Sequence, residues 1–403
     1  MKKYIIISLL LALSNSYIWA QNDRRTLTAY LYPCIPNAEA YYTKIEGMFE
    51  KQYPDIDLQI VIDDSTKSSV PKYYDGGLYG SQADVLEIDC IFLDSLIRKN
   101  SIMTYPDQNF LKARNDTMNY DGMAYRDGIL YVLPHWIHGN FLFYHKDDAA
   151  IKNTIYLYEL EKVLGIDRKA LTTDLSSDLT MGKMYADNLY NNKGDKTQVG
   201  IALHQMQPDA EAITNIQHLM HLTDSLFSLS RDSADVRIKG FVEGKFRVHI
   251  GNAESSNKIL KTIKSQTGIH NLKQQDIAVR DCPLSNNGSH PLGWVTALGI
   301  KTGLSEQKQE DAKTLVNFLL SDEGYLNALI PDGNDMPRYL LPAYKKYYQI
   351  PTVLEKAPLY RYFLPLVEDM KPLTLPEMNN EILKNAGRKV IEKIINQPGA
   401  ERK

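Results

Sequence analysis

Residues 27–62 read LTAYLYPCIPNAEAYYTKIEGMFEKQYPDIDLQIVI, and this stretch decides the fold. Residues 27–31 alternate between apolar and polar side chains as a strand does, until two prolines end any regular element. Apolar side chains then recur at helical spacing over residues 45–49, and residues 56–62 alternate again. The order strand, helix, strand predicts a βαβ unit, which indicates parallel pairing within a sheet.

The length of the chain points to more than one compact unit. Its 403 residues exceed the roughly 250–300 that one hydrophobic core supports, so two lobes are the expectation. We predict a discontinuous first lobe formed by residues 21–147 and 301–403, with residues 148–300 forming the second. The predicted class is therefore α/β, with two lobes joined by crossing segments.

The N-terminus has the order of a secretory signal peptide. Two lysines precede an apolar run over residues 4–13, and Ala20 then leads into a polar stretch that starts at Gln21. The apolar run is too short for a comfortable membrane span, and nothing later in the sequence resembles one. We expect residues 1–20 to be a signal peptide and the mature protein to be secreted, either extracellular or periplasmic, with no membrane span.

The charge and the cysteine content limit the kinds of partner that we expect this protein to bind. A net charge of -3, with lysines scattered along the chain, gives no basis for binding a polyanion such as nucleic acid. The three cysteines, Cys34, Cys90 and Cys282, are an odd number, which excludes a full disulfide framework. We expect a monomer whose partner is a small molecule.

One carboxylate lies at the end of a predicted buried strand. Residues 85–93 are mostly apolar and contain Asp89, with a helix start predicted from Asp94. An acid at the carboxyl end of a strand faces the ligand cleft in sheets of this kind. The alternative is that Asp89 caps the following helix, where exposed amides favour an acid.

Two histidines lie close together between two short predicted strands. Residues 128–134 form a strand that enters a proline turn, residues 141–144 form one that leaves it, and the turn holds His135 and His138. Two imidazoles and the carboxylate of Glu254 would be a known set of zinc ligands. The spacing alone is a weak signal, and we assign no metal.

Five motifs in the same order resemble those of thiaminase I, a thiamine pyridinylase. The resemblance covers about residues 30–367 and implies the fold of periplasmic solute-binding proteins (type 2), with two lobes and mainly parallel sheets. The motifs are Tyr32-Pro33, residues 86–93, Leu133-Pro134 with residues 140–144, residues 250–255 and residues 339–343.

The resemblance implies a specific chemistry. Members of the family add a cysteine thiolate to the pyrimidine ring of thiamine, expel the thiazole and pass the pyrimidine to a second nucleophile. The family's glutamate base corresponds to Glu254 and its cleft aspartate to Asp89, whereas its nucleophilic cysteine falls on His138. The family uses no metal, and we expect no cofactor.

Other pocket positions of the family also differ in this sequence. Family tyrosines correspond to Asn252, Trp294 and Asp235, and an aspartate near the thiazolium corresponds to Thr296. The lost aspartate weakens the case for a cationic ligand, while the indole of Trp294 suits a flat ring. The expected ligand contacts are Tyr32, Asp89, His135, Asp235, Asn252, Trp294 and Thr296.

Two functions follow from this pattern. The first is a secreted, thiaminase-I-like protein that binds a small heterocycle such as thiamine or an analogue, without cysteine-dependent cleavage. The alternative is an active thiamine pyridinylase or related transferase, with Glu254 as base and His138 or a relocated thiol as nucleophile. Cys34 is the better thiol, because strand alternation turns Cys90 away from the side of Asp89. A sugar or oligopeptide binder shares the fold but does not predict Glu254.

Overall fold

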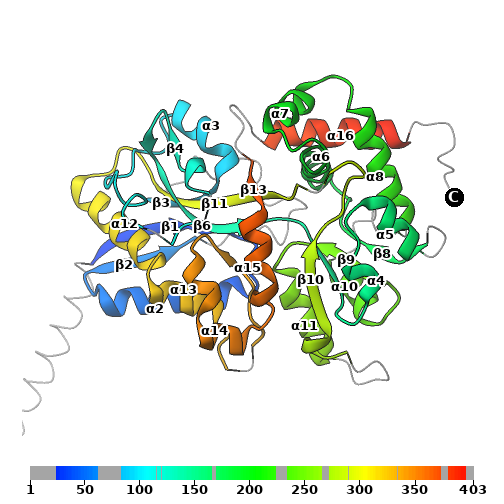
Figure 1. Ribbon diagram of the computed structural model, residues 1–403. Helices are drawn as coiled ribbons and strands as arrows, with labels where there is room; N and C mark the ends of the chain where they lie inside the picture. The colour runs from blue at the N-terminus through cyan, green and yellow to red at the C-terminus, as the bar shows by residue number, and fades with distance from the viewer. Residues whose placement is uncertain are drawn as a thin grey trace, which may run out of the picture.

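The computed structural model describes ten stretches of the chain, and the predicted signal peptide lies outside them. Within these stretches, helices surround two large sheets, so that the molecule consists of two lobes side by side (Figure 1). The described residues are 24–61, 83–114, 116–118, 120–165, 169–223, 234–265, 272–288, 290–333, 335–373 and 380–395.

The first lobe is built on a sheet that has seven strands within the described residues. Its order is β12-β6-β11-β3-β1-β2, with β13 beside β11. The strands are β1 (Arg25–Tyr30), β2 (Ile56–Ile60), β3 (Val85–Asp89), β6 (Val132–His138), β11 (Leu292–Ile300), β12 (Leu341–Pro342) and β13 (Lys371–Pro372).

The predicted βαβ unit is confirmed. Helix α2 (Ala38–Gln52) connects β1 to β2, and the two strands pair in parallel from Arg25 opposite Ile56 onward. Strand β3 also runs parallel to β1. On its inner face, α2 buries Ile45 and Phe49, two of the apolar positions whose spacing predicts the helix.

The expectation of mainly parallel sheets is wrong, because both sheets are mixed. Strand β11 runs antiparallel to β3 on one side and to β6 on the other, and β6 is antiparallel to β12. The reason is the path of the chain: β11 returns from the second lobe and enters the sheet from the edge at which β3 ends. A bulge between Thr296 and Ala297 shifts its register against β6.

The second lobe is built on a sheet of four strands, again counting only described residues, in the order β10-β7-β9-β8. Strand β7 runs antiparallel to both of its neighbours, whereas β8 and β9 are parallel. The strands are β7 (Phe141–His145), β8 (Leu171–Thr172), β9 (Val248–Gly251) and β10 (Ile277–Asp281).

Helices cover the sheets of both lobes (Figure 1). Besides α2, the first lobe has α3 (Leu93–Arg98), α12 (Glu306–Leu319), α13 (Asp322–Leu329), α14 (Pro351–Lys356) and α15 (Tyr360–Asp369). Around the second sheet lie α4 (Ala149–Lys152), α5 (Leu157–Leu164), α6 (Asp178–Lys193), α7 (Lys196–His204), α8 (Ala210–Leu222), α10 (Ala234–Val242), α11 (Ser255–Ser265) and α16 (Asn380–Ile395).

Short elements complete the described structure. Strands β4 (Tyr125–Arg126) and β5 (Ile129–Leu130) form a small hairpin. The 3-10 helices are η4 (Cys90–Phe92), η5 (Asp121–Met123), η7 (Gln274–Asp276) and η8 (Lys345–Gln349). No helix in the described part of the chain is long and apolar enough to cross a membrane.

Helix α6 is well defined at both ends, which matters because it carries residues of the site. The hydroxyl of Ser177 accepts a hydrogen bond of 3.1 Å from the amide of Thr180, and Gly194 ends the helix with a φ of 62°. Gly182 brings α16 close: an ideal Cβ there would lie 2.0 Å from the carbonyl oxygen of Leu383. The last described helix therefore packs against the second lobe.

The predicted lobe boundaries differ from the way in which the sheets divide the chain. Strand β7 lies in the second sheet and β11 in the first, so the chain crosses between the lobes near residues 139–140 and 291. The prediction places residues 301–403 in the first lobe. Helix α16 belongs to this range but packs on α6 of the second lobe (Figure 1). The boundaries themselves stay a prediction.

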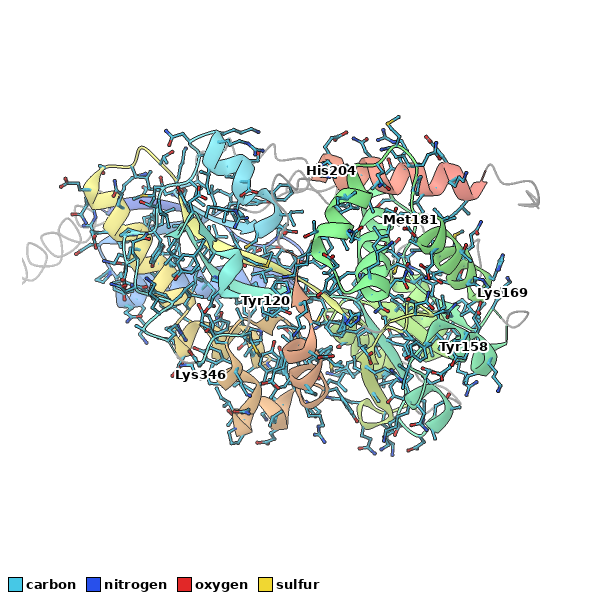
Figure 2. The ribbon with its side chains drawn as sticks, turned by 45° about the horizontal axis from the view of Figure 1, so that its top comes forward. Tyr120, Tyr158, Lys169, Met181, His204 and Lys346 are labelled. Atoms are coloured by element: carbon cyan, nitrogen blue, oxygen red, sulfur yellow. The ribbon has the colours of Figure 1, made fainter. Side chains whose placement is uncertain are left out.

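The hydroxyl of a buried tyrosine, Tyr120, lies close to the backbone of β11 near the crossing between the lobes. Tyr120 lies near the middle of the molecule, whereas Lys346 lies on the first lobe and Tyr158 on the second (Figure 2). An ideal Cβ on Gly293 of β11 would lie 2.5 Å from the hydroxyl oxygen of Tyr120. Only glycine therefore allows the tyrosine ring to lie against the crossing strand.

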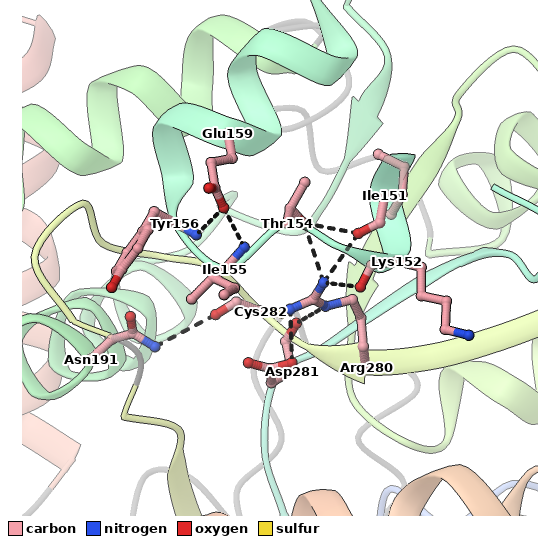
Figure 3. A network of polar contacts seen from close by, with 10 residues as sticks. All are labelled: Ile151, Lys152, Thr154, Ile155, Tyr156, Glu159, Asn191, Arg280, Asp281 and Cys282. Carbon is pink, nitrogen blue, oxygen red and sulfur yellow. Dashed lines mark hydrogen bonds and ion pairs between the residues drawn. The ribbon is translucent and has the colours of Figure 1, made fainter. Parts of the chain in front are cut away.

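A network of polar contacts holds the outer part of the second lobe together (Figure 3). From β10, the guanidinium of Arg280 donates to the carbonyl oxygens of Ile151 and Lys152, at 3.1 and 2.7 Å. The carbonyl oxygen of Ile151 also accepts from the amide and the hydroxyl of Thr154, at 3.2 and 2.9 Å. The same guanidinium reaches the hydroxyl of Thr154, which ties α4 to the sheet.

Candidate active site and ligand cavity

A cavity of about 750 Å³ opens between the two lobes. The first lobe contributes Tyr32, Asp89 and Trp294 to its lining, and the second contributes Asn252 and Glu254 among others. Its volume lies in the range of small-molecule sites, about 300–1,000 Å³. Residues that are far apart in the sequence thus share one space.

Strand pairing explains why the first-lobe residues meet. Thr296 of β11 lies opposite Asp89 of β3, and Trp294 of the same strand lies opposite His138 of β6. Because residues two apart on a strand point to the same face, Trp294 and Thr296 both face the cavity. All four side chains line it.

Asp89 is both a cap and a cavity residue. Its Oδ1 accepts a hydrogen bond of 3.2 Å from the amide of Ile91, which caps η4. Its Oδ2 lies 3.7 Å from Nζ of Lys183, which comes from α6 of the second lobe. Asp89 therefore both caps a helix and faces the cavity, the two roles considered from the sequence. Its ion pair with Lys183 connects the two lobes across the cavity.

His138, the last residue of β6, and Glu254, which follows β9, lie together in the cavity. Nδ1 of His138 is 3.4 Å from Oε1 of Glu254, close enough for an ion pair if the imidazole is protonated. The Tyr32 ring lies 4.7 Å from the imidazole, centroid to centroid. Among the described residues, neither Nε2 of His138 nor Oε1 of Glu254 has a hydrogen-bond partner, although both atoms are buried. Two buried polar atoms are thus available to a ligand.

Two further predicted contacts, Asp235 and Asn252, also line the cavity. Asp235, in the first turn of α10, is largely exposed and pairs with Nζ of Lys258 at 3.1 Å. The Oδ1 of Asn252 accepts a hydrogen bond of 3.2 Å from the hydroxyl of Ser255. Both side chains belong to the second-lobe wall.

The structure does not bring His135 into the cavity, which corrects its expected role as a ligand contact. Its ring is buried, and Nδ1 lies 2.9 Å from Oε1 of Glu87. Both histidines belong to strand β6 and not to the turn expected from the sequence, and side chains three positions apart on a strand point to opposite faces, so His135 points away from the side of His138.

Glu87 is the buried centre of a network under the cavity floor. Its carboxylate accepts from the amide of Tyr32 at 2.9 Å and from the hydroxyl of Thr296 at 3.0 Å, besides its contact with His135. Burial alone would raise its pKa, but the charge of His135 and these hydrogen bonds together lower it. The carboxylate therefore fixes the positions of two cavity residues.

Comparisons with known proteins bear on the identity of this site. No family model matches the chain. Thiaminase-1 of Paenibacillus thiaminolyticus is 24% identical over 358 residues, which cover 85% of this chain and 81% of that protein. The chain is similar to thiaminase I over most of its length.

Solved structures agree on the fold of this thiaminase I-like chain. Clostridium botulinum thiaminase I in complex with thiamin superposes with a TM-score of 0.76 at 23% identity, covering 91% of this chain and 99% of that one. Maltose-bound MalE3 of T. maritima gives 0.63 at 16% identity, with the same coverage. Together they show the α/β fold of periplasmic solute-binding proteins.

Several cavity residues of the thiaminase I-like protein were not predicted from the sequence. On α6, Lys183 lies 5.3 Å from the ring centroid of Trp294, in addition to its pairing with Asp89. Thr180 and Met184 also line the cavity, and Thr180 precedes Lys183 by three positions and Met184 by four, which is the spacing of one helix face. That spacing is a signal in the sequence, but it does not tell which face meets the other lobe.

Two buried polar residues on the second-lobe wall were also missed. Arg237 is 3% exposed and pairs with Asp174 at 3.0 Å. His249 is 5% exposed, and burial together with the charge of Arg237 lowers its pKa to about 3. The imidazole of His249 is therefore neutral near pH 7.

The three thiols of the thiaminase I-like chain differ sharply in access. Cys34 is exposed and lines the cavity, whereas Cys90 and Cys282 are buried outside it. Burial raises the pKa of both buried thiols, which disfavours their thiolates. The carbonyl of Cys282 accepts from Asn191 in the polar network of Figure 3. Only Cys34 has the access that a nucleophile needs.

No metal centre is formed within the described ranges, where no group of three or more His, Cys, Asp or Glu side chains could hold an ion. The set weighed from the sequence, His135 with His138 and Glu254, does not converge. His135 contacts Glu87 under the floor, while the other two line the cavity.

Proposed function

We propose that this chain is a member of the thiaminase I family that binds thiamine or a closely related heterocycle between its lobes, without cysteine-dependent cleavage. The position that the resemblance assigns to the family's nucleophilic cysteine holds His138, beside the glutamate that matches the family's base. The observation that carries this proposal is the pairing of His138 with Glu254, 3.4 Å apart at the cavity floor.

The choice of ligand rests on the relatives. The thiaminase I of Clostridium botulinum was solved in complex with thiamin, and a eukaryotic thiaminase I was solved bound to 3-deazathiamin. This cavity has side chains that suit a flat, polar ring. Trp294 and Tyr32 offer aromatic surface, and Asp89 offers a carboxylate for exchangeable N–H groups.

The remaining predicted contacts complete the proposed site. Asn252 and Asp235 form its second-lobe side, and Thr296 forms part of the floor. In this account Glu254 and His138 contact the ligand without forming a covalent bond to it. Oε1 of Glu254 and Nε2 of His138 are buried and have no hydrogen-bond partner among the described residues, and both gain hydrogen bonds when the ligand is present.

Loss of the thiol removes the covalent route for a chemical reason. Cleavage of thiamine needs a group that adds to the pyrimidine and later leaves it, and a thiolate does both well near neutral pH. An imidazole beside a carboxylate is suited to proton transfer and to hydrogen bonding. His138 therefore keeps the site polar without restoring the nucleophile.

One observation favours the alternative of an active transferase. Cys34 is exposed and lines the same cavity as Glu254, so a thiol and a base share one space. In this reading Cys34 forms the bond to the pyrimidine and Glu254 accepts its proton. The buried thiols of Cys90 and Cys282 do not compete for this role.

Location and lobe organisation belong to the same proposal. A secretory signal over residues 1–20 would deliver a mature chain from Gln21 to the periplasm or outside the cell. We place residues 24–138 and 292–373 in the first lobe and residues 141–288 and 380–395 in the second, following the two sheets and the packing of α16 on α6.

The test is an assay of thiamine cleavage with pyridine as acceptor, read by chromatography of the released thiazole. We expect the wild-type protein to release none above the rate without protein, because no thiol occupies the position of attack. Release proportional to protein concentration would contradict the proposal. Its loss in both Cys34→Ser and Glu254→Gln would then establish the alternative.

A further inference from the structure

The second-lobe wall of the cavity contains a buried imidazole whose ring nitrogens lack a hydrogen-bond partner of good geometry within the described part of the chain. His249 of β9 lines the cavity, and among the described residues neither of its ring nitrogens has a hydrogen-bond partner. The main-chain carbonyl of Thr172, on the neighbouring strand β8, favours the protonated ring without reaching hydrogen-bond geometry. Since buried polar groups are normally hydrogen-bonded, this ring needs an explanation.

The charge state of the ring limits what it can bind. Its pKa is lowered to about 3 by burial and by the nearby Arg237, so the imidazole is neutral near pH 7. A neutral imidazole has one donor and one acceptor nitrogen. Arg237 is paired with Asp174, so the wall beside His249 has little net charge. Such a wall matches a neutral group that both donates and accepts, as an alcohol does.

A glycine leaves the ring accessible from the cavity. Gly251 lies two residues after His249 on the same face of β9. An ideal Cβ at this position would lie 2.7 Å from Nε2 of His249 and 2.5 Å from Oγ of Ser255. Any side chain there would therefore fill the space in front of both atoms. Behind the ring lie Phe143 and Phe241, with centroids 5.8 and 6.2 Å away.

We propose that His249 and Ser255, reached over Gly251, form a subsite for an alcohol hydroxyl of the ligand. The proposal rests on the proposed function, in which the ligand is thiamine, whose thiazolium ring carries one hydroxyethyl arm. The hydroxyl of that arm donates to one nitrogen or oxygen of the subsite and accepts from another. The ring's missing hydrogen bonds are then supplied by the ligand.

The experiment is titration calorimetry with two probes, thiamine and an analogue in which an ethyl group replaces the hydroxyethyl arm. In the wild-type protein we expect thiamine to bind about tenfold more tightly, since only thiamine completes the buried hydrogen bonds. His249→Phe should bind both probes equally, because phenyl fills the space without a polar atom. His249→Gln, which keeps a donor and an acceptor, is the matched control and should retain most of the preference.

The outcomes separate this subsite from the proposed function. If the wild-type protein fails to bind thiamine at all, the proposed function fails, and the subsite with it. If thiamine binds but the ethyl analogue binds equally well, or if His249→Phe keeps the tenfold preference, only the subsite is overturned. If His249→Phe does not fold, Ser255→Ala replaces it. That variant should lower the preference about threefold, and an unchanged preference would contradict the subsite.

Discussion

At the scale of single residues, the account depends on carboxylates that two lobes bring to one cavity. Asp89 ends a strand of the first lobe, and Glu254 follows a strand of the second, more than 160 positions later in the chain. Each lies beside a basic partner from another element, Lys183 for Asp89 and His138 for Glu254. A ligand that enters the cavity must compete with or complement these pairs.

The first prediction at this scale is that Asp89→Asn weakens thiamine binding by about 1–3 kcal/mol, the usual cost of disrupting a buried polar contact. Titration calorimetry measures it. Asp94→Asn is the matched control, because Asp94 lies only five positions away but pairs with Arg126 and does not line the cavity. Equal thiamine affinity in Asp89→Asn and the wild-type protein would remove Asp89 from the site.

The sequence predicted several of the cavity residues but not the residues that hold them in place. Asp89 and Glu254 were found because each stands in a motif next to a strand end. Glu87 stands in the same motif as Asp89, yet its role depends on His135, 48 positions away. No local pattern reveals such a contact. His135 was misplaced because the sequence predicted a turn that holds both histidines, whereas both lie on β6, where side chains three positions apart point to opposite faces.

At the scale of elements, α6 connects the cavity to the crossings between the lobes. Asp187 of this helix accepts a hydrogen bond of 2.9 Å from the side chain of Asn140, in the first crossing. The carboxyl of Asp187 also accepts a hydrogen bond from the backbone of Leu292, where β11 begins. Burial raises its pKa from 3.8 to about 7, although the contacts oppose the rise. One helix therefore contacts the chain at two of the crossings between the lobes through one buried acid.

This acid predicts a pH dependence of stability. Between pH 3.8 and about 7 the folded protein holds a proton on Asp187 that the unfolded chain has released, so stability falls as pH rises through this window. Asp187→Asn has no such proton. Relative to this variant, the wild-type protein should lose about 2–4 kcal/mol between pH 4 and pH 8, as measured by urea unfolding. Parallel pH curves for the two proteins would contradict the prediction.

The elements themselves were predictable where the signal is local. Helical spacing and alternation over residues 27–62 predict β1, α2 and β2 correctly, because such patterns depend on neighbouring residues only. The direction of β11 was not predictable in this way. It depends on the route by which the chain returns from the second lobe, and that route is set by packing between distant segments. The position of α16 on α6 is likewise set by the close approach at Gly182.

At the scale of the whole molecule, the fold forms a cavity between two lobes, and the side chains that line the cavity determine its function. Solute-binding proteins and thiaminase I share this architecture, as the similarity to both MalE3 and the clostridial enzyme shows. The fold therefore leaves binding and catalysis both open. In this chain, the choice rests on a histidine in contact with a glutamate and on one exposed thiol, Cys34, at the edge of the cavity.

Mass spectrometry of the mature protein mixed with thiamine tests the central claim most directly, because one sample reports binding under native conditions and covalent change after denaturation. The account predicts one intact thiamine per chain in the native spectrum and an unmodified chain mass after denaturation. Two results would contradict it. One is the absence of any complex at saturating thiamine, and the other is a pyrimidine-sized mass that remains on the denatured chain.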